Sequence, residues 1–376
     1  MSEKQNMSDH VVHPSSKTRS KDSTENGIDD QQLSNLRDDF ELIKIYQSIS
    51  KKDAWKSIQR QTTGRTVAFP HVIVANWRSI AAILIPLLVM GFMFVKIQNQ
   101  KALYAFKDVK PGNSKAILLM PNGAKVSLPE YTHHQIFDKK GIKLGTNTNN
   151  TFFCEKISDA DNGESNIMYV PTGGEYKLVL SDGTQVSVNS DSRIQFPYSF
   201  QKEKREVSLV GEAFFEVAKN EKQPFEVHTR NSVITVLGTK FNVSSYSKEQ
   251  FEKITLEQGA VSVKYQDQFY SLVPGMQLLI DTKTSTATIN EVDANLYSSW
   301  KEGLFRFQNM SLDDLTQKIE RWYNVQFVFE NDDCKTLRFT GAYARNANFN
   351  DFIYLIESTT GVNFTRKDDK IIITKK

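Results

Sequence analysis

The side chains best suited to chemistry are few in this chain, and they are not grouped at the spacings that known reactions need. Six histidines are present, and one adjacent pair, His133-His134, lies in PEYTHHQIF. No carboxylate or cysteine stands at metal-ligand spacing from that pair, so no metal site is expected there. Cys154 and Cys334 are far apart in the sequence. Two separate thiols are therefore favoured over a mutual disulfide.

Other patterns associated with catalysis or cofactors are incomplete. The stretch DADNGES, from Asp159, resembles a calcium loop but lacks the third oxygen ligand, the following glycine and the distal glutamate. A solvated turn is the better interpretation. The sequence shows no glycine-rich phosphate loop, no Gly-x-Ser-x-Gly elbow and no nucleophile with a neighbouring base. We predict no catalytic, cofactor-binding or metal-binding residue, and a binding or signalling protein rather than an enzyme.

The composition is that of a folded protein with a core, and its charge does not suggest a nucleic-acid partner. The 376 residues are 39% hydrophobic and 24% charged, which fits two or three domains. The formal net charge is only +3. Lysines and arginines are scattered rather than clustered, so we expect no direct contact with nucleic acid.

One segment has the length and composition of a membrane-spanning helix. The run SIAAILIPLLVMGFMFV, from Ser79 to Val95, contains no charged residue. Trp77 and Arg78 flank one end and Lys96 the other, as interfacial anchors do. We place a single transmembrane helix at residues 78–97. A buried core helix is the alternative.

The orientation of this span is ambiguous from charge. Three arginines lie within 20 residues on its N-terminal side, and five lysines lie within 20 on its C-terminal side. The positive-inside rule would therefore put the C-terminus in the cytoplasm. Large domains, however, translocate largely regardless of charge, so the count does not decide.

The residues before the span form a polar tail and then a helical segment. Residues 1–30 are rich in Ser, Asp and Lys without apolar period, and are predicted to be disordered. Residues 31–77 are assigned to a helical segment, because apolar residues recur at steps of three and four from Asp30 to about Gln61. About thirty residues cannot enclose a core, so this segment needs a partner surface. A self-packed helical hairpin is the alternative.

The residues after the span contain the same hairpin pattern twice. PGNSKAILLMPNGAKVSL begins at Pro111, and PTGGEYKLVLSDGTQVSVNS begins at Pro171. Each has an apolar run, a turn ending in glycine and a second alternating run. We expect the first copy to pair beside the second and to tie the linker into the sheet, although chance similarity could explain the likeness. Residues 98–165 are assigned to a linker and the first hairpin, and 166–292 to an all-β domain.

The last part of the chain has a different pattern. Residues 296–376 predict the order β-α-β-β-α-β-β, a small two-layer α/β domain. One helix is predicted over SLDDLTQKIERWYN, with Ser311 as its N-cap and Leu312, Leu315, Ile319 and Trp322 on its buried face. The closing strand, DKIIITKK, is either an exposed edge open to β-augmentation or an ordinary hairpin strand.

Three stretches together resemble a known family. TGGEYKLVLSDGTQVSVNSDSRIQFP, VSLVGEAFFEVAKNEKQPFEVHT and VLGTKFNVSSY resemble the periplasmic domain of FecR-type transmembrane anti-sigma factors, the ferric-citrate-transport regulator family. WKEGLFRFQNMSLDDLTQKIERWYNVQFVFE resembles the C-terminal domain of its Bacteroidetes-type members. The resemblance implies an inner-membrane protein with its N-terminus in the cytoplasm and its C-terminus in the periplasm. It also implies that the terminal domain is similar to secretin and TonB short N-terminal domains.

The resemblance also implies partners. The cytoplasmic helices would hold an extracytoplasmic-function sigma factor, and the periplasmic part would meet the signalling domain of a TonB-dependent outer-membrane transporter. Periplasmic and intramembrane proteases would then release the sigma factor. The residues expected at the sigma factor are Leu33, Leu36, Phe40, Ile43 and Trp55. Those expected at the transporter are Trp300, Phe305, Arg321, Trp322, Tyr323 and Ile372.

A second hypothesis is a membrane-anchored glycan-binding or wall-binding module. Aromatic side chains on a β domain could stack on sugar rings. Tyr198, Tyr246 and Tyr265 are not spaced as an obvious stacking platform.

Overall fold

The structure is a computed structural model that describes residues 90, 106–128, 133–137, 141–157, 165–200 and 203–376. The predicted tail, the helical segment and, apart from Met90, the predicted span lie outside these residues. Within the described ranges, none of the helices has the length and apolar character that a membrane crossing requires.

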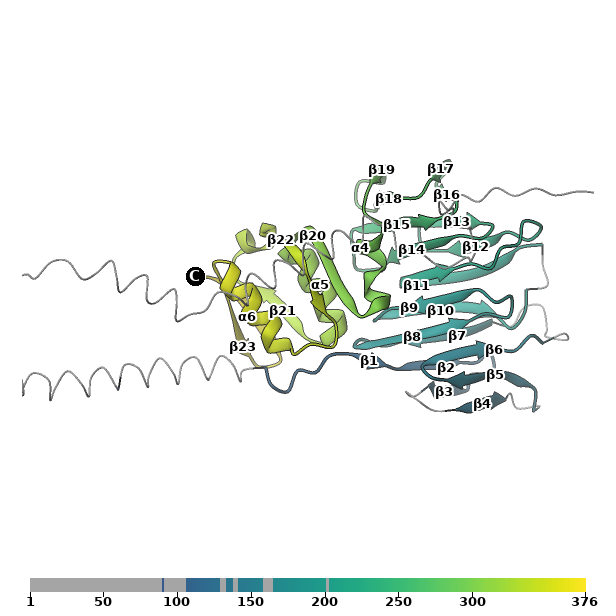
Figure 1. Cartoon of the computed structure of the whole chain (residues 1–376), viewed down its shortest axis with the longest axis horizontal. Helices are drawn as coiled ribbons and strands as arrows, with labels where there is room; N and C mark the ends of the chain where they lie inside the picture. The colour runs from purple at the N-terminus through teal and green to yellow at the C-terminus, as the bar shows by residue number, and fades with distance from the viewer. Residues whose placement is uncertain (1–89, 91–105, 129–132, 138–140, 158–164, 201–202) are drawn as a thin grey trace, which may run out of the picture. The chain divides into compact units, whose positions relative to one another are not determined.

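Two β-sheets, joined through one shared strand, make up the larger part of the described chain (Figure 1). In pairing order, the first sheet contains β3 (Lys125–Leu128), β2 (Ala116–Leu119), β7 (Ser165–Val170), β10 (Ser192–Pro197), β11 (Arg205–Glu216), β12 (Phe225–His228), β13 (Ser232–Val236), β16 (Val261–Tyr265) and β17 (Gln268–Leu272). Alternate residues of these strands are buried, as expected for a sheet with one face on a core.

The second sheet contains β4 (His134–Phe137), β5 (Lys143–Thr148), β6 (Thr151–Cys154), β8 (Gly174–Val179), β9 (Gln185–Val188), again β11, then β14 (Lys240–Ser245), β15 (Phe251–Gln258), β18 (Met276–Asp281) and β19 (Thr286–Glu291). Apolar side chains from both sheets form a single buried cluster. The two sheets are therefore the layers of one β-sandwich.

Strand β11 belongs to both sheets because it bends at Gly211. Its first half pairs with β10 and β12, and its second half pairs with β9 and β14. Gly211 has φ +106°, and a Cβ atom added there would lie 2.6 Å from Cβ of Ser192. Only glycine satisfies both the backbone angle and the close approach.

The sequence repeat is also a structural repeat. Gly123 and Gly183 have φ values of +81° and +86°. The side-chain oxygens of Asn122 and Asp182 accept from the backbone N–H two residues later, at 2.9 and 3.0 Å. The strand registers also correspond: Leu118 lies opposite Val126, and Leu178 lies opposite Val186. The same turn chemistry therefore closes both hairpins.

The hairpin strands of the two copies do not pair with each other, however. Hairpin β2–β3 lies in the first sheet beside β7, whereas hairpin β8–β9 lies in the second sheet. The expectation that the first copy pairs beside the second is wrong for its hairpin strands. It is right for β1 (Asn113–Ser114), which also belongs to the first copy and pairs in parallel with β8, so that the linker is joined to the second copy.

A smaller body follows, with its own core. Its elements are α4 (Asn295–Ser298), η1 (Ser299–Glu302), β20 (Leu304–Ser311), α5 (Leu312–Tyr323), β21 (Gln326–Phe329), η2 (Asp332–Thr336), β22 (Arg338–Ala344), α6 (Phe349–Thr359), β23 (Val362–Lys367) and β24 (Lys370–Lys375). The predicted order of strands and long helices is confirmed. The strands divide into two sheets, β20–β22 and β21–β24–β23. We call residues 304–375 the C-terminal domain.

Helix α5 follows its sequence prediction closely. The Ser311 hydroxyl accepts from the backbone N–H of Asp314 at 3.1 Å, which caps the helix. The helix ends at Asn324, which has φ +52°. The four residues predicted for its inner face are all buried.

The closing strand β24 is central rather than exposed. It pairs in parallel with β21 on one side and antiparallel with β23 on the other. The suggestion of an edge open to β-augmentation is therefore wrong for this strand, and the hairpin alternative is right. The edge strands of this sheet are β21 and β23.

The bend in β11 predicts that adding one methyl group at Gly211 lowers the stability of the protein. Gly211→Ala combines an unfavourable positive φ with steric overlap between the new Cβ and Ser192. We expect it to lower the free energy of unfolding by about 1–3 kcal/mol. Gly123→Ala is the matched control. It has a similar φ, but nothing lies within 4 Å of the added Cβ. Urea unfolding of the two variants should show the larger loss for Gly211→Ala, and equal losses would contradict this account.

Candidate functional site

The residues predicted for transporter contact mostly lie inside the protein. Trp300, Phe305, Trp322 and Tyr323 are buried. Ile372 is half-buried on the central strand β24. Trp300, Arg321 and Trp322 lie where the C-terminal domain meets the sandwich, a contact that we call the seam. The transporter contact itself stays a prediction, and the five sigma-factor residues lie outside the described residues.

A closed circuit of hydrogen bonds joins the two bodies across the seam. Its members are Asn189, Glu212, Asn242, Trp300 and Arg345. The amide of Asn189 donates to Glu212 at 2.7 Å, and the amide of Asn242 donates to the other oxygen of Glu212 at 3.0 Å. Asn242 accepts from the indole N–H of Trp300 at 3.2 Å.

Arg345 closes this circuit from the other end. Its guanidinium donates to the carbonyl of Trp300 at 3.1 Å and to Oδ1 of Asn189 at 2.9 Å. Glu212 and Arg345 are only 3% and 2% exposed. Buried charges are tolerated when hydrogen bonds satisfy them, and the circuit supplies such bonds to both residues, although Nε of Arg345 has no partner.

Aromatic rings enclose the Arg345 cation. The guanidinium carbon lies 3.7 Å from the ring centroid of Trp322, 5.3 Å from that of Phe305 and 5.7 Å from that of Trp300. The carboxylate of Glu175 on β8 lies 3.5 Å from a terminal nitrogen of the Arg345 guanidinium. Burial lowers the pKa of Arg345, and Glu175 opposes that effect. The desolvated cation–π contacts explain why an arginine can occupy this position.

Arg321 makes a second connection across the seam. Its guanidinium donates to Glu249 at 2.6 Å and lies 4.0 Å from the ring centroid of Tyr246. Its backbone carbonyl accepts from the N–H of Gly173 at 2.7 Å. The end of α5 is therefore bound to two separate loops of the sandwich.

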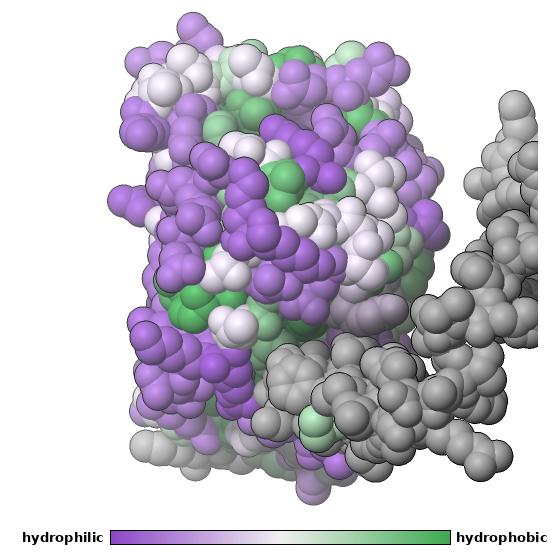
Figure 2. Space-filling view, turned by 90° about the vertical axis from the view of Figure 1, so that its left-hand side faces the viewer, coloured by the Kyte–Doolittle hydropathy of each residue, from purple (hydrophilic) through white to green (hydrophobic). Residues whose placement is uncertain are grey.

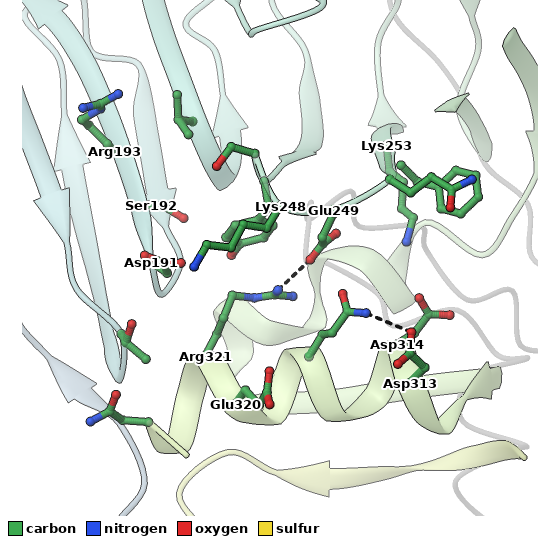
Figure 3. Close-up of a pocket in the computed structure, with 18 of the residues that line it drawn as sticks. Asp191, Ser192, Arg193, Lys248, Glu249, Lys253, Asp313, Asp314, Glu320 and Arg321 are labelled. Atoms are coloured by element: carbon green, nitrogen blue, oxygen red, sulfur yellow. Dashed lines mark hydrogen bonds and ion pairs between the residues drawn. The ribbon is translucent and has the colours of Figure 1, made fainter. Parts of the chain in front are cut away.

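A groove of about 780 Å³ opens beside this second connection (Figure 3). One wall is α5, with Asp313, Asp314, Glu320 and Arg321 facing the opening. The other wall includes residues 191–193, 246–251 and 253 of the sandwich. Cationic and anionic side chains alternate around it, so the groove suits a polar segment of mixed charge rather than a polyanion.

Burial shifts the pKa values of two charged side chains on α5, Lys318 and Glu320. Burial lowers the pKa of Lys318, with Glu212 opposing and Lys253 adding to the shift. Burial also raises the pKa of Glu320, although the N–H of Phe327 donates to its carboxylate at 2.6 Å. Desolvation is the largest cause of both shifts.

The groove has no side chains arranged for covalent or metal chemistry. Its lining includes serines and a threonine but neither histidine nor cysteine. Among the described residues, side chains able to share a metal ion come together elsewhere, on β11 and β12. The groove is therefore suited to binding.

The accessible face of the C-terminal domain is mainly hydrophilic. Figure 2, which looks onto the left-hand side of Figure 1, shows hydrophobic residues as separate patches among hydrophilic ones. On α6, Tyr354 and Leu355 are exposed. No sequence pattern marked these two residues beforehand.

The sequence prediction missed Asn189, Glu212, Asn242 and Arg345. Glu212 gave a weak signal, because it is a charged residue inside the apolar run of GEAFFEVA. Nothing in the sequence shows that these four residues meet, since they come from widely separated segments.

Comparisons with known proteins agree with this architecture. Residues 166–262 match the family described as FecR protein, and residues 304–373 match that described as FecR, C-terminal. Two crystal structures, at 1.65 and 2.50 Å, of "a putative anti-sigma factor from Parabacteroides distasonis ATCC 8503" are similar. They have 26% and 25% identity and a TM-score of 0.53 each, and the match covers 56% of this chain and 99% of theirs. The comparison with curated proteins gives no match.

Both FecR domain models match the chain in sequence order, which supports a FecR-type protein. The family is regulatory rather than enzymatic. These findings support a role as an anti-sigma factor.

The circuit predicts different effects for two glutamates of the same strand. Glu212→Gln places an amide donor against the donor amides of Asn189 or Asn242, and we expect about 1–3 kcal/mol of destabilisation. Glu216→Gln is the matched control, because Glu216 pairs with Lys240 near the surface; its loss should be below about 1 kcal/mol. Chemical denaturation measures both, and a cost for Glu216→Gln as large as that for Glu212→Gln would refute this role for the circuit.

Proposed function

We propose that the protein is a single-pass inner-membrane anti-sigma factor. Its residues 31–77 hold an extracytoplasmic-function sigma factor in the cytoplasm. Its periplasmic part relays a signal from the signalling domain of a TonB-dependent outer-membrane transporter, and regulated proteolysis releases the sigma factor. The proposal rests on the presence of both FecR domains in one chain, C-terminal to a segment that is predicted to span a membrane.

The sigma-factor contact is tested with the full chain in its native membrane. After mild crosslinking and purification, mass spectrometry should identify a sigma factor. Leu36→Ser with Phe40→Ser should remove most of it, because both residues lie on the predicted apolar stripe. Asp38→Ser, on the opposite side of the same predicted helix, should retain it. The absence of any sigma factor from the unaltered chain would count against the proposal.

A relay needs a mechanical connection between the sensing domain and the chain that enters the membrane. Residues 106–114 form such a connection, and we call them the juxtamembrane strip. Phe106 is 2% exposed and belongs to the core of the C-terminal domain. Its ring lies 5.5 Å from that of Phe349, and its N–H donates to Asn350 at 3.2 Å. Asp108 forms an ion pair with Arg366.

The strip then crosses from the C-terminal domain to the sandwich. A Cβ atom at Gly112 would lie 2.7 Å from the Trp322 ring and 2.8 Å from the carbonyl of Gly173. Asn113 donates to that same carbonyl at 3.0 Å. The strip therefore touches the residues that form the seam. A displacement of the C-terminal domain would pull on the strip and hence on the short segment between it and the predicted span.

Phe106 is the residue to test in this relay. Phe106→Ala removes an aromatic ring from a core, a change that typically costs about 3–5 kcal/mol, so the start of the strip should detach. Limited proteolysis of the full chain in detergent should then cut near residues 100–112 faster than in the unaltered protein. Phe269→Ala is the control, because Phe269 is largely exposed on β17. Identical cleavage rates in all three proteins would contradict the proposed connection.

The glycan-binding alternative gains no support from its three tyrosines. Tyr198, Tyr246 and Tyr265 are all buried. Stacking on a sugar needs an accessible ring face, which these residues do not offer. We therefore keep the anti-sigma relay as the proposed function.

A further inference from the structure

Three side chains with ligand atoms meet on the first sheet, away from the seam. Glu206 lies on β11, and Glu226 and His228 lie on β12. The two strands run in parallel with Glu206 opposite Glu226. Since alternate residues of a strand face the same side, His228 lies on the same face as Glu226. One ligand atom from each of the three lies within 4.8 Å of the others.

The arrangement calls for a cation. Two carboxylates directly opposed across a strand pair repel each other. Lys204 offsets part of this charge through Oε1 of Glu226, at 2.7 Å. The other oxygen, Oε2, faces Nε2 of His228 at 3.4 Å. That imidazole nitrogen is shielded from solvent and has no hydrogen-bond partner.

The distance between these two atoms fits a shared metal better than a direct bond. A hydrogen bond between nitrogen and oxygen is normally about 2.7–3.2 Å long. Two ligands of a tetrahedral zinc ion, each about 2.0–2.1 Å from the metal, lie roughly 3.3–3.4 Å apart. The third ligand atom, on Glu206, lies within 4.8 Å of both of them.

We propose that Glu206, Glu226 and His228 bind a divalent metal ion of the zinc class. One imidazole and two carboxylates favour zinc over calcium or magnesium, which prefer oxygen ligands alone. Water would complete the four-coordinate shell. The bound ion would join β11 to β12 and neutralise the opposed carboxylates, so the role is structural. This proposal is independent of the anti-sigma function.

The experiment uses the untagged full chain in detergent, stripped with a chelator and then dialysed against buffer containing zinc sulfate. We expect one zinc per chain by elemental analysis and a higher melting temperature with zinc than without. His228→Ala and Glu206→Gln should each lose the zinc and the shift. His134→Ala, which changes an exposed histidine at the start of β4, should keep both.

A separate measurement covers the case in which His228→Ala fails to fold. Cobalt added to the stripped, unaltered chain should give the visible absorption of tetrahedral Co²⁺, and zinc should abolish it. Less than one zinc per chain with no cobalt spectrum would overturn the proposal and leave a His228–Glu226 ion pair. Zinc retention unchanged in Glu206→Gln and in His228→Ala would overturn it as well.

Discussion

The structure depends on how Glu212 and Arg345 are held away from water. Charges of opposite sign buried at a contact are costly unless every polar group finds a partner. The circuit through Asn189, Asn242 and Trp300 provides partners for Glu212 and for two of the three guanidinium nitrogens of Arg345, whose Nε has no partner. Separating the bodies would break the bonds of Arg345 to Asn189 and of Trp300 to Asn242, whereas Glu212 would keep both amide partners; the two crossing bonds favour a single arrangement of the seam.

This constraint gives the proposed relay its physical basis. A signal received by the C-terminal domain can reach the membrane side only through contacts that resist bending. The seam provides one such contact, and the juxtamembrane strip provides another through Phe106 and Gly112. Because the strip touches Trp322, and Trp322 stacks on Arg345, the two contacts share a residue. We therefore expect a displacement of residues at the seam to displace the juxtamembrane strip as well.

Much of the local structure could be predicted from the sequence, and the candidate site could not. The period of two in the strands, the Asn-Gly and Asp-Gly turns and the cap at Ser311 each depend on neighbouring residues. They were confirmed at Gly123, Gly183 and α5. The pairing partners of β2 were mispredicted and those of β24 were left open, because a strand's hydrophobic pattern fixes which face is buried and not which strand lies beside it.

The sequence alone determined the order of the elements, the buried face of each and the resemblance to the FecR family. All three depend on the spacing of neighbouring residues or on short stretches of sequence. The tertiary structure decided which distant polar residues meet. Glu212 and Arg345 form a seam, and Glu206, Glu226 and His228 form a cluster, only because strand order and register bring them together. These residues are brought together by packing between distant segments, and no short stretch of sequence predicts it.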